Sequence, residues 1–180
     1  KAFSYAGERC AILGISNKLA ERVYPDLKEF CGQDIFLRGI IFGALHPLSS
    51  GTSHSAQYAL AGVLKAVNDG TYNYRNDVLE YGEKAKMMKD AFTSNGFKFT
   101  YDEDLGEPIA DGFYFTYYYP GMTGAELLEK MLYYGISAIS LDTCGSTRQG
   151  IRACTSLIQR DEIPVLAERL KRFAEDHPIK

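Results

Sequence analysis

The chain has 180 residues, of which 46% are hydrophobic and 24% charged, and its formal net charge is −3. These values lie near the averages of soluble globular proteins, so they exclude a disordered or fibrous chain. Lysines and arginines are scattered along the sequence. Because this distribution gives no basic surface for a phosphate backbone, we expect no nucleic-acid partner.

The sequence also bears on the cellular compartment. No stretch approaches the roughly 20 apolar residues that a membrane-spanning helix needs, so we expect no membrane partner. Cys10, Cys31, Cys144 and Cys154 show no C-x-x-C spacing and are predicted to be free thiols of a cytoplasmic protein. The first residue is Lys1 and not Met, from which we expect a piece of a longer protein.

The N-terminal part of the chain is predicted to be mostly helical. Over residues 16–30 the apolar side chains step by four behind a possible Ser16 or Asn17 cap, and Pro25 is expected to break this helix. A second apolar segment, residues 35–45, is expected to stop at His46 and Pro47.

Two further helices are predicted beyond a Ser-rich loop. Ser53 or Ser55 can cap a helix that ends near Gly70. The strongest helical pattern covers residues 74–95, where apolar side chains recur every three or four positions, and Gly96 is its C-terminal stop. We expect this helix to be continuous and to pack on a small sheet.

Strands enter after this long helix. Residues 97–101 and the aromatic run 113–119 are predicted strands, because aromatic residues favour strands. An acidic turn is expected between them. Thr123 followed by Glu126 has the spacing of a capping box, which opens a helix that Gly135 closes.

The C-terminal end completes the pattern. Residues 136–141 and 150–157 are predicted strands, and Asp161 can cap a final amphipathic helix. This order indicates an α/β chain, with an α+β second part in which helices pack on a small, mostly antiparallel sheet. The pattern changes near residue 73, which divides the chain into domains 1–72 and 73–180.

Common catalytic signatures are absent from the sequence. It contains no G-x-S-x-G, no Walker loop and no G-x-G-x-x-G. His46, His54 and His177 lie in unrelated contexts, and no two of them share a helix face with a carboxylate partner. We therefore expect no metal site.

The start of the chain, KAFSYAGERCA, resembles the lysine motif of class I and II aminotransferases. In that motif the cofactor lysine is followed by small residues three, six and ten positions on and by an arginine eight positions on. The matching residues are Lys1, Ser4, Gly7, Arg9 and Ala11. Tyr5 and Cys10 depart from the usual aliphatic choices.

The resemblance continues along nearly the whole chain in the same order. Residues 49–68 are similar to the family's Ser/Thr-rich turn and the alanine-rich helix at its subunit interface. Residues 112–141 are similar to its small-domain strand, helix and strand. Residues 150–155, GIRACT, look like the strand that bears the arginine for the substrate carboxylate.

This resemblance implies a pyridoxal 5'-phosphate-dependent aminotransferase of fold type I. Lys1 would form an imine with the cofactor aldehyde and move the substrate α-proton. Arg9 would pair with the cofactor phosphate, and Arg152 would bind the α-carboxylate through two parallel hydrogen bonds. Residues 1–72 would then be the end of the large cofactor-binding domain, and residues 73–180 the small domain.

The resemblance also implies the partners, which are amino-acid and 2-oxo-acid substrates and a second copy of the chain in a homodimer. It does not separate aminotransferases from related lyases or synthases. The groups that hold the cofactor ring in this family precede the lysine, so we expect the 180 residues alone to be inactive.

The residues themselves are also compatible with plainer interpretations of the two sites. Lys1 can be a solvated chain end, and Arg152 can be a rim residue whose stem snorkels to solvent. The whole chain can likewise be a non-catalytic folded module or a stand-alone binding or regulatory domain, because a shared architecture does not imply a shared function.

Overall fold

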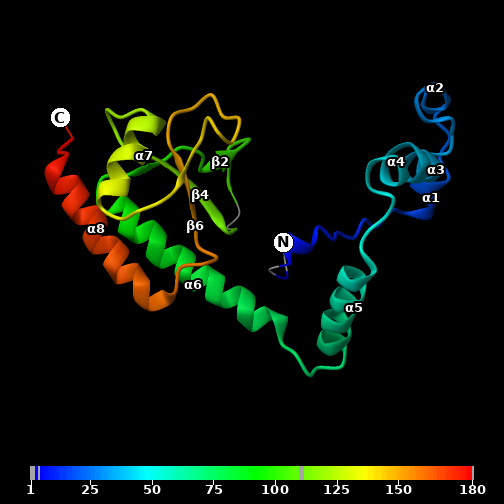
Figure 1. Cartoon of the computed structure of the whole chain (residues 1–180), viewed down its shortest axis with the longest axis horizontal. Helices are drawn as coiled ribbons and strands as arrows, with labels where there is room; N and C mark the ends of the chain where they lie inside the picture. Colours follow the sequence, from blue (N-terminus) through cyan, green and yellow to red (C-terminus); the bar gives the residue numbers. More distant parts are fainter. Residues whose placement is uncertain (1–2, 4, 110–111, 180) are drawn as a thin grey trace. The chain divides into compact units, whose positions relative to one another are not determined.

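The structure, a computed structural model, describes residues 3, 5–109 and 112–179. The chain divides into two compact units, Lys1–Asn73 and Tyr74–Lys180 (Figure 1). The division falls at the start of the long helix Tyr74–Thr93.

The N-terminal unit consists of short helical segments followed by one longer helix. The segments are a 3₁₀ turn η1 (Ala6–Glu8), α1 (Asn17–Ala20), α2 (Leu27–Cys31), α3 (Phe36–Ile40), a π-helical turn η2 (Ile41–Leu45), α4 (His46–Ser49) and α5 (His54–Asn68). Ser16 caps α1 by accepting a hydrogen bond from the Leu19 backbone N–H. The predicted break at Pro25 is confirmed, because it lies between α1 and α2.

The predicted stop at His46 and Pro47 is wrong. The chain is helical through η2 and on to Ser49, with Pro47 in the first turn of α4. Proline lacks a backbone N–H, and here it follows directly on the π-helical turn, where the regular α-helical hydrogen-bond pattern is already interrupted. The helix ends instead at Ser50, whose backbone adopts the left-handed conformation with φ 53°.

The C-terminal unit packs helices on a small sheet. Its elements are α6 (Tyr74–Thr93), β1 (Lys98–Phe99), β2 (Glu103–Asp104), β3 (Glu107–Pro108), β4 (Tyr114–Tyr118), α7 (Gly124–Tyr133), β5 (Ile139–Ser140), β6 (Ile151–Cys154), a 3₁₀ turn η3 (Arg160–Glu162) and α8 (Ile163–Asp176). The main sheet is antiparallel with strand order β1-β4-β6-β5. The predicted mixture of helices and a small antiparallel sheet is therefore confirmed (Figure 1).

One face of this sheet and the helices α6, α7 and α8 form a single hydrophobic core. Phe115 pairs with Ala153 and Tyr117 with Ile151, and all four side chains are buried. Because side chains alternate along a strand, these four lie on one face. The helices contribute buried residues to the same core, among them Met88, Phe92, Leu127, Met131, Leu170 and Phe173.

The long helix α6 is continuous, as predicted. Met88 and Phe92 are buried, whereas Val78 is 43% exposed. The buried residues of α6 begin at Lys84, so only the second half of the helix packs on the core. The period of the apolar residues predicted the helix correctly. It did not reveal which part of the helix packs against the core.

The capping box at the start of α7 is confirmed. The Thr123 hydroxyl accepts a hydrogen bond from the Glu126 backbone N–H, and the Glu126 carboxylate accepts one from the Thr123 backbone N–H. The predicted Asp161 cap of the last helix is wrong. A capping box of Gln159 and Glu162 opens the 3₁₀ turn before α8 instead.

The acidic turn expected after β1 is in fact a separate hairpin of β2 and β3. Its two-residue loop is Leu105 and Gly106, both with positive φ, 53° and 83°. Two positive φ values are typical of the tight turns whose twist matches a hairpin. Such turns usually carry Asn-Gly or Asp-Gly, so leucine in the first position hid the hairpin from sequence reasoning.

Candidate functional site

Arg152 lies in the middle of the sheet of the C-terminal unit. Strand β6 runs between β4 and β5, and Arg152 is paired with Thr116 on one side and Ile139 on the other. Its neighbours Ile151 and Ala153 are buried in the core. Arg152 therefore lies on the opposite face of the sheet, where it is half-buried.

The backbone that leads into this strand is tightly confined. Gly150 has φ +142°, and a Cβ atom there would come within 2.4 Å of the Tyr117 carbonyl oxygen and 2.7 Å of the Thr100 hydroxyl. The Gly150 carbonyl in turn accepts a hydrogen bond from the Leu141 backbone N–H. Only glycine suits this conformation and this close approach of two chain segments. The close packing around Gly150 therefore fixes the backbone two residues before Arg152.

The guanidinium of Arg152 stacks on an aromatic ring. Its Cζ atom lies 4.4 Å from the centroid of the Tyr114 ring, a cation–π contact that holds the planar group above the sheet. Within the described part of the chain, the guanidinium donates no hydrogen bond and joins no ion pair. Its donors therefore remain available to an anionic ligand.

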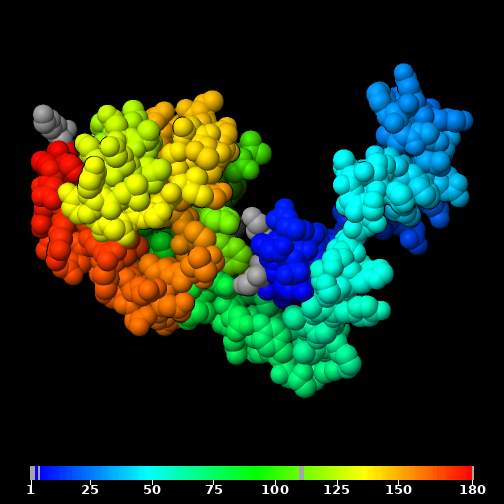
Figure 2. Space-filling model, viewed as in Figure 1, coloured from blue at the N-terminus to red at the C-terminus, as the bar shows by residue number. Residues whose placement is uncertain are grey.

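A cavity of about 660 Å³ opens beside Arg152. Arg152 and Tyr114 line it from the sheet, and Met88 and Phe92 line it from α6. Another part of its lining is formed by Glu162 of η3 and by Val165, Leu166 and Arg169 of α8. Figure 2 shows the surface of this unit. The residues that follow α7 are yellow in it, and the start of α8 is orange. The volume lies within the range of about 300–1,000 Å³ that is usual for small-molecule sites.

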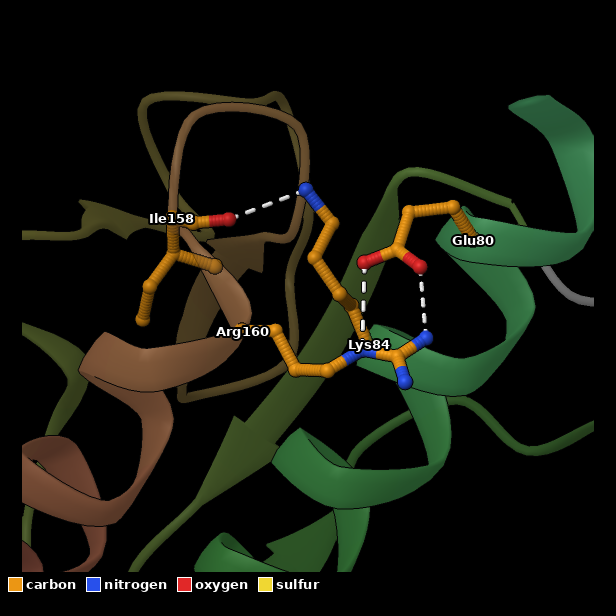
Figure 3. A network of polar contacts seen from close by, with 4 residues as sticks. All are labelled: Glu80, Lys84, Ile158 and Arg160. Carbon is orange, nitrogen blue, oxygen red and sulfur yellow. Dashed lines mark hydrogen bonds and ion pairs between the residues drawn. The ribbon is translucent and has the colours of Figure 1, made fainter.

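A network of polar contacts holds the segment after β6, which forms one wall of this cavity (Figure 3). Lys84 of α6 is only 6% exposed, and its Nζ donates a hydrogen bond of 2.9 Å to the Ile158 carbonyl oxygen. Nearby, Arg160 donates to both carboxylate oxygens of Glu80, at 3.2 Å from Nε and 2.5 Å from Nη2. Ile158 itself lines the cavity, so α6 holds the segment that closes it.

Sequence reasoning missed Lys84, although a signal was present. Tyr81 and Met88 belong to the apolar stripe of α6, and Lys84 lies three residues after one and four before the other. Residues with this spacing share a helix face. A lysine on a buried face needs a partner for its charge, and the Ile158 carbonyl and the Tyr81 ring, 5.1 Å from Nζ, provide it.

A second arginine near the sheet serves the loop before β6. Nη1 of Arg148 donates a hydrogen bond of 2.8 Å to the Thr100 carbonyl oxygen, and its Cζ lies 4.7 Å from the Tyr101 ring centroid. The Tyr101 hydroxyl is 2.7 Å from the Ser146 hydroxyl. Since these groups bind one another, we assign the cluster to the order of the loop and not to a ligand.

Arg9 lies in the N-terminal unit, at the end of the η1 turn. Its backbone is left-handed, with φ 54°, and its side chain is exposed. Nη1 donates a long hydrogen bond of 3.3 Å to the Ala6 carbonyl oxygen, and the described residues use none of the other guanidinium donors. Arg9 therefore has the donors that a phosphate group requires.

The three predicted site residues do not fall within one described unit of the chain. Lys1 lies outside the described residues. Arg9 belongs to the N-terminal unit and Arg152 to the C-terminal unit. The residues present nevertheless suit the cofactor that the resemblance implies, because Arg9 can hold its phosphate and Arg152 a substrate carboxylate.

Two other features are missing from the described residues. Residues 3, 5–109 and 112–179 contain no cluster of three or more His, Cys, Asp or Glu side chains arranged to hold a metal ion. No helix in the same part of the chain is long and apolar enough to cross a membrane.

Comparison with known proteins adds no family to this picture. No protein-family model matches the chain, and no curated protein matches it. A function for this site must therefore be argued from the residues of the chain itself.

Proposed function

We propose that the chain carries part of the active site of a pyridoxal-phosphate-dependent aminotransferase. In this proposal Arg152 binds the α-carboxylate of the amino acid or 2-oxo acid, Arg9 binds the cofactor phosphate and Lys1 is the attachment lysine. Residues 1–72 belong to the large domain of the enzyme and residues 73–180 to its small domain. The active enzyme is a cytoplasmic homodimer.

The observation that carries the proposal is the state of the Arg152 side chain. A snorkelling rim residue would extend its charged head into solvent. Arg152 instead stacks 4.4 Å from the Tyr114 ring, beside a cavity and with its hydrogen-bond donors unused by described residues. A planar guanidinium held in this way is suited to bind a carboxylate through two parallel hydrogen bonds.

Each residue has a distinct part in the proposed reaction. The cofactor, when bound, supplies the electron sink that allows an amino acid to lose its α-proton. The Lys1 amine would act as the base that takes up the α-proton and as the acid that gives it back. Arg9 fixes the phosphate end of the cofactor, and Arg152 orients the substrate so that the α-proton faces the lysine. Related lyases and synthases would use the same three residues, and analysis of the products distinguishes them.

The proposal is tested by trapping the cofactor on the chain. The purified 180-residue chain is incubated with pyridoxal phosphate and then with borohydride, and the labelled peptide is identified by mass spectrometry. We expect the label on the Lys1 side chain, in a yield that falls at least tenfold in Arg9→Gln. The Lys1→Ala variant is the control, because it keeps every other amine, and label at equal yield in this variant contradicts the proposal.

Measurements of turnover distinguish the isolated 180 residues from a longer enzyme that contains them. We expect no measurable transamination by the 180 residues alone, because the residues that hold the cofactor ring in this family precede the lysine. In a longer protein that contains this chain, Lys1→Ala should abolish activity and Arg152→Ala should weaken amino-acid binding. A charge-assisted pair is worth about 1.5–3 kcal/mol, roughly a tenfold to hundredfold rise in KM. An unchanged KM and kcat for the amino donor in Arg152→Ala would remove Arg152 from the site.

A further inference from the structure

The cavity beside Arg152 has a lining that is informative about its ligand. Apart from the arginine, its sheet wall carries Ile139, and its opposite wall carries Leu157, Val165 and Leu166. Most of the lining is apolar. A site with an apolar body and a few fixed polar groups is typical of binding sites for small organic molecules.

Several of these apolar side chains are left open to solvent. Leu157 is 87% exposed and Val165 is 49% exposed, although both lie beside a cavity. Exposed apolar groups that gather around one hollow mark a surface that a ligand or partner covers. The hollow between them has the size of a small molecule and opens beside a charged group.

The charged side chains of the lining differ in the hydrogen bonds that they already make within the chain. Nη1 of Arg169 donates a hydrogen bond of 2.8 Å to the Gly135 carbonyl oxygen. Glu162 accepts a hydrogen bond of 2.7 Å from the Gln159 backbone N–H as part of a capping box. Arg152 is the lining charge whose hydrogen-bond donors no described residue uses. Within the described part of the chain, the cavity thus offers a cation with unused donors next to an aliphatic surface.

We propose that this cavity receives the side chain of the substrate whose carboxylate Arg152 binds. The substrates are then monocarboxylic amino acids and 2-oxo acids with aliphatic or aromatic side chains, which the mostly apolar lining favours over dicarboxylic acids. This inference rests on the proposed function for its carboxylate site, but binding to the cavity requires no cofactor. A second carboxylate beside Val165 and Leu157 would gain no hydrogen bond from these two apolar side chains.

Binding is measured by calorimetry on the purified 180-residue chain without cofactor. The probes are 4-methyl-2-oxopentanoate, which has one carboxylate and an aliphatic body, and 2-oxoglutarate, which has two carboxylates. We expect the first to bind at least tenfold more tightly. We also expect Val165→Asp and Leu157→Asp to weaken its binding at least tenfold, and both positions are exposed enough for the variants to fold.

Arg172→Gln is the matched control, because Arg172 lies on α8, pairs with Glu168 and does not line the cavity. It should leave the affinity unchanged. Equal binding of the two acids, or affinity unchanged in both aspartate variants, overturns the assignment of the cavity. If Arg152→Gln then still abolishes binding, the carboxylate site of the proposed function stands without the cavity. Failure of cofactor trapping at Lys1 would remove the proposed enzyme but would leave the selectivity of the cavity measurable.

Discussion

The two units of the chain differ in how they use their apolar residues. In the C-terminal unit, strands and helices bury a continuous core that includes Phe92, Leu127 and Phe173. Among the described residues of the N-terminal unit, only Gly39 and Ala56 are buried. Three large apolar side chains of that unit are mostly exposed to solvent: Phe30 is 82% exposed, Leu48 84% and Tyr58 79%.

This difference shows that regular helices do not by themselves make a stable unit. The separate helices α1 and α2 have four and five residues, and helices of that length are marginal in water without tertiary packing. Large exposed apolar groups also mark surfaces that another molecule or segment covers. We therefore expect the C-terminal unit to dominate the stability of the chain. That the N-terminal surface belongs to a homodimer stays a prediction.

The comparison is tested most strongly by removing a large side chain from each unit. Phe92 is 2% exposed and stacks on Tyr117 with ring centroids 4.3 Å apart. Phe92→Ala should lower the free energy of unfolding by about 3–5 kcal/mol, because it leaves a cavity in the core. Phe30→Ala should change it by less than about 0.5 kcal/mol. Urea unfolding followed by circular dichroism measures both, and similar losses would contradict the comparison.

A second test addresses the backbone before Arg152. Gly150→Ala should destabilise the C-terminal unit by roughly 1–3 kcal/mol from the strained φ alone, and further through overlap with the Tyr117 carbonyl. Gly145→Ala is the control, because Gly145 also has a positive φ, +84°, but no described atom lies within 4 Å of its added Cβ. Thermal unfolding should rank Gly150→Ala as the more damaging. Equal effects would mean that the close approach at Gly150 does not matter.

The buried lysine of α6 provides a third test. Lys84→Met keeps the aliphatic stem but removes the donor to the Ile158 carbonyl, which should cost roughly 1–3 kcal/mol. Arg160→Gln removes the exposed pair with Glu80, about half-exposed on both sides, and should cost only about 0–1 kcal/mol. Urea midpoints of the two variants give the comparison. A larger loss in Arg160→Gln would reverse the roles that we assign to these contacts.

The smallest effect is expected from the capping box of α7. Hydrogen bonds from the Thr123 backbone N–H and from its hydroxyl lower the pKa of Glu126 below its usual value. A lowered pKa means that the contribution to stability is present above the ordinary glutamate pKa and is lost as pH falls through the lowered one. Between about pH 6 and about pH 3 the urea midpoint should therefore fall less in Glu126→Gln than in the parent chain. Identical pH profiles would show that the carboxylate does not stabilise the helix.

The sequence by itself determined the local elements of the C-terminal unit. The period of residues 74–95 predicted α6, and the spacing of Thr123 and Glu126 predicted the start of α7. The aromatic run predicted β4. These signals are readable because each one depends on residues within a few positions of one another, where helix period, capping and strand preference act.

The tertiary structure decided the site. The sequence singled out Arg152, but only the register of β4, β5 and β6 shows that it faces away from the core and stacks on Tyr114. The cavity, and the hold of Lys84 on Ile158, join residues that are far apart in the chain. Such contacts depend on which segments pack together and on how much free energy their burial contributes, and no local pattern contains that information.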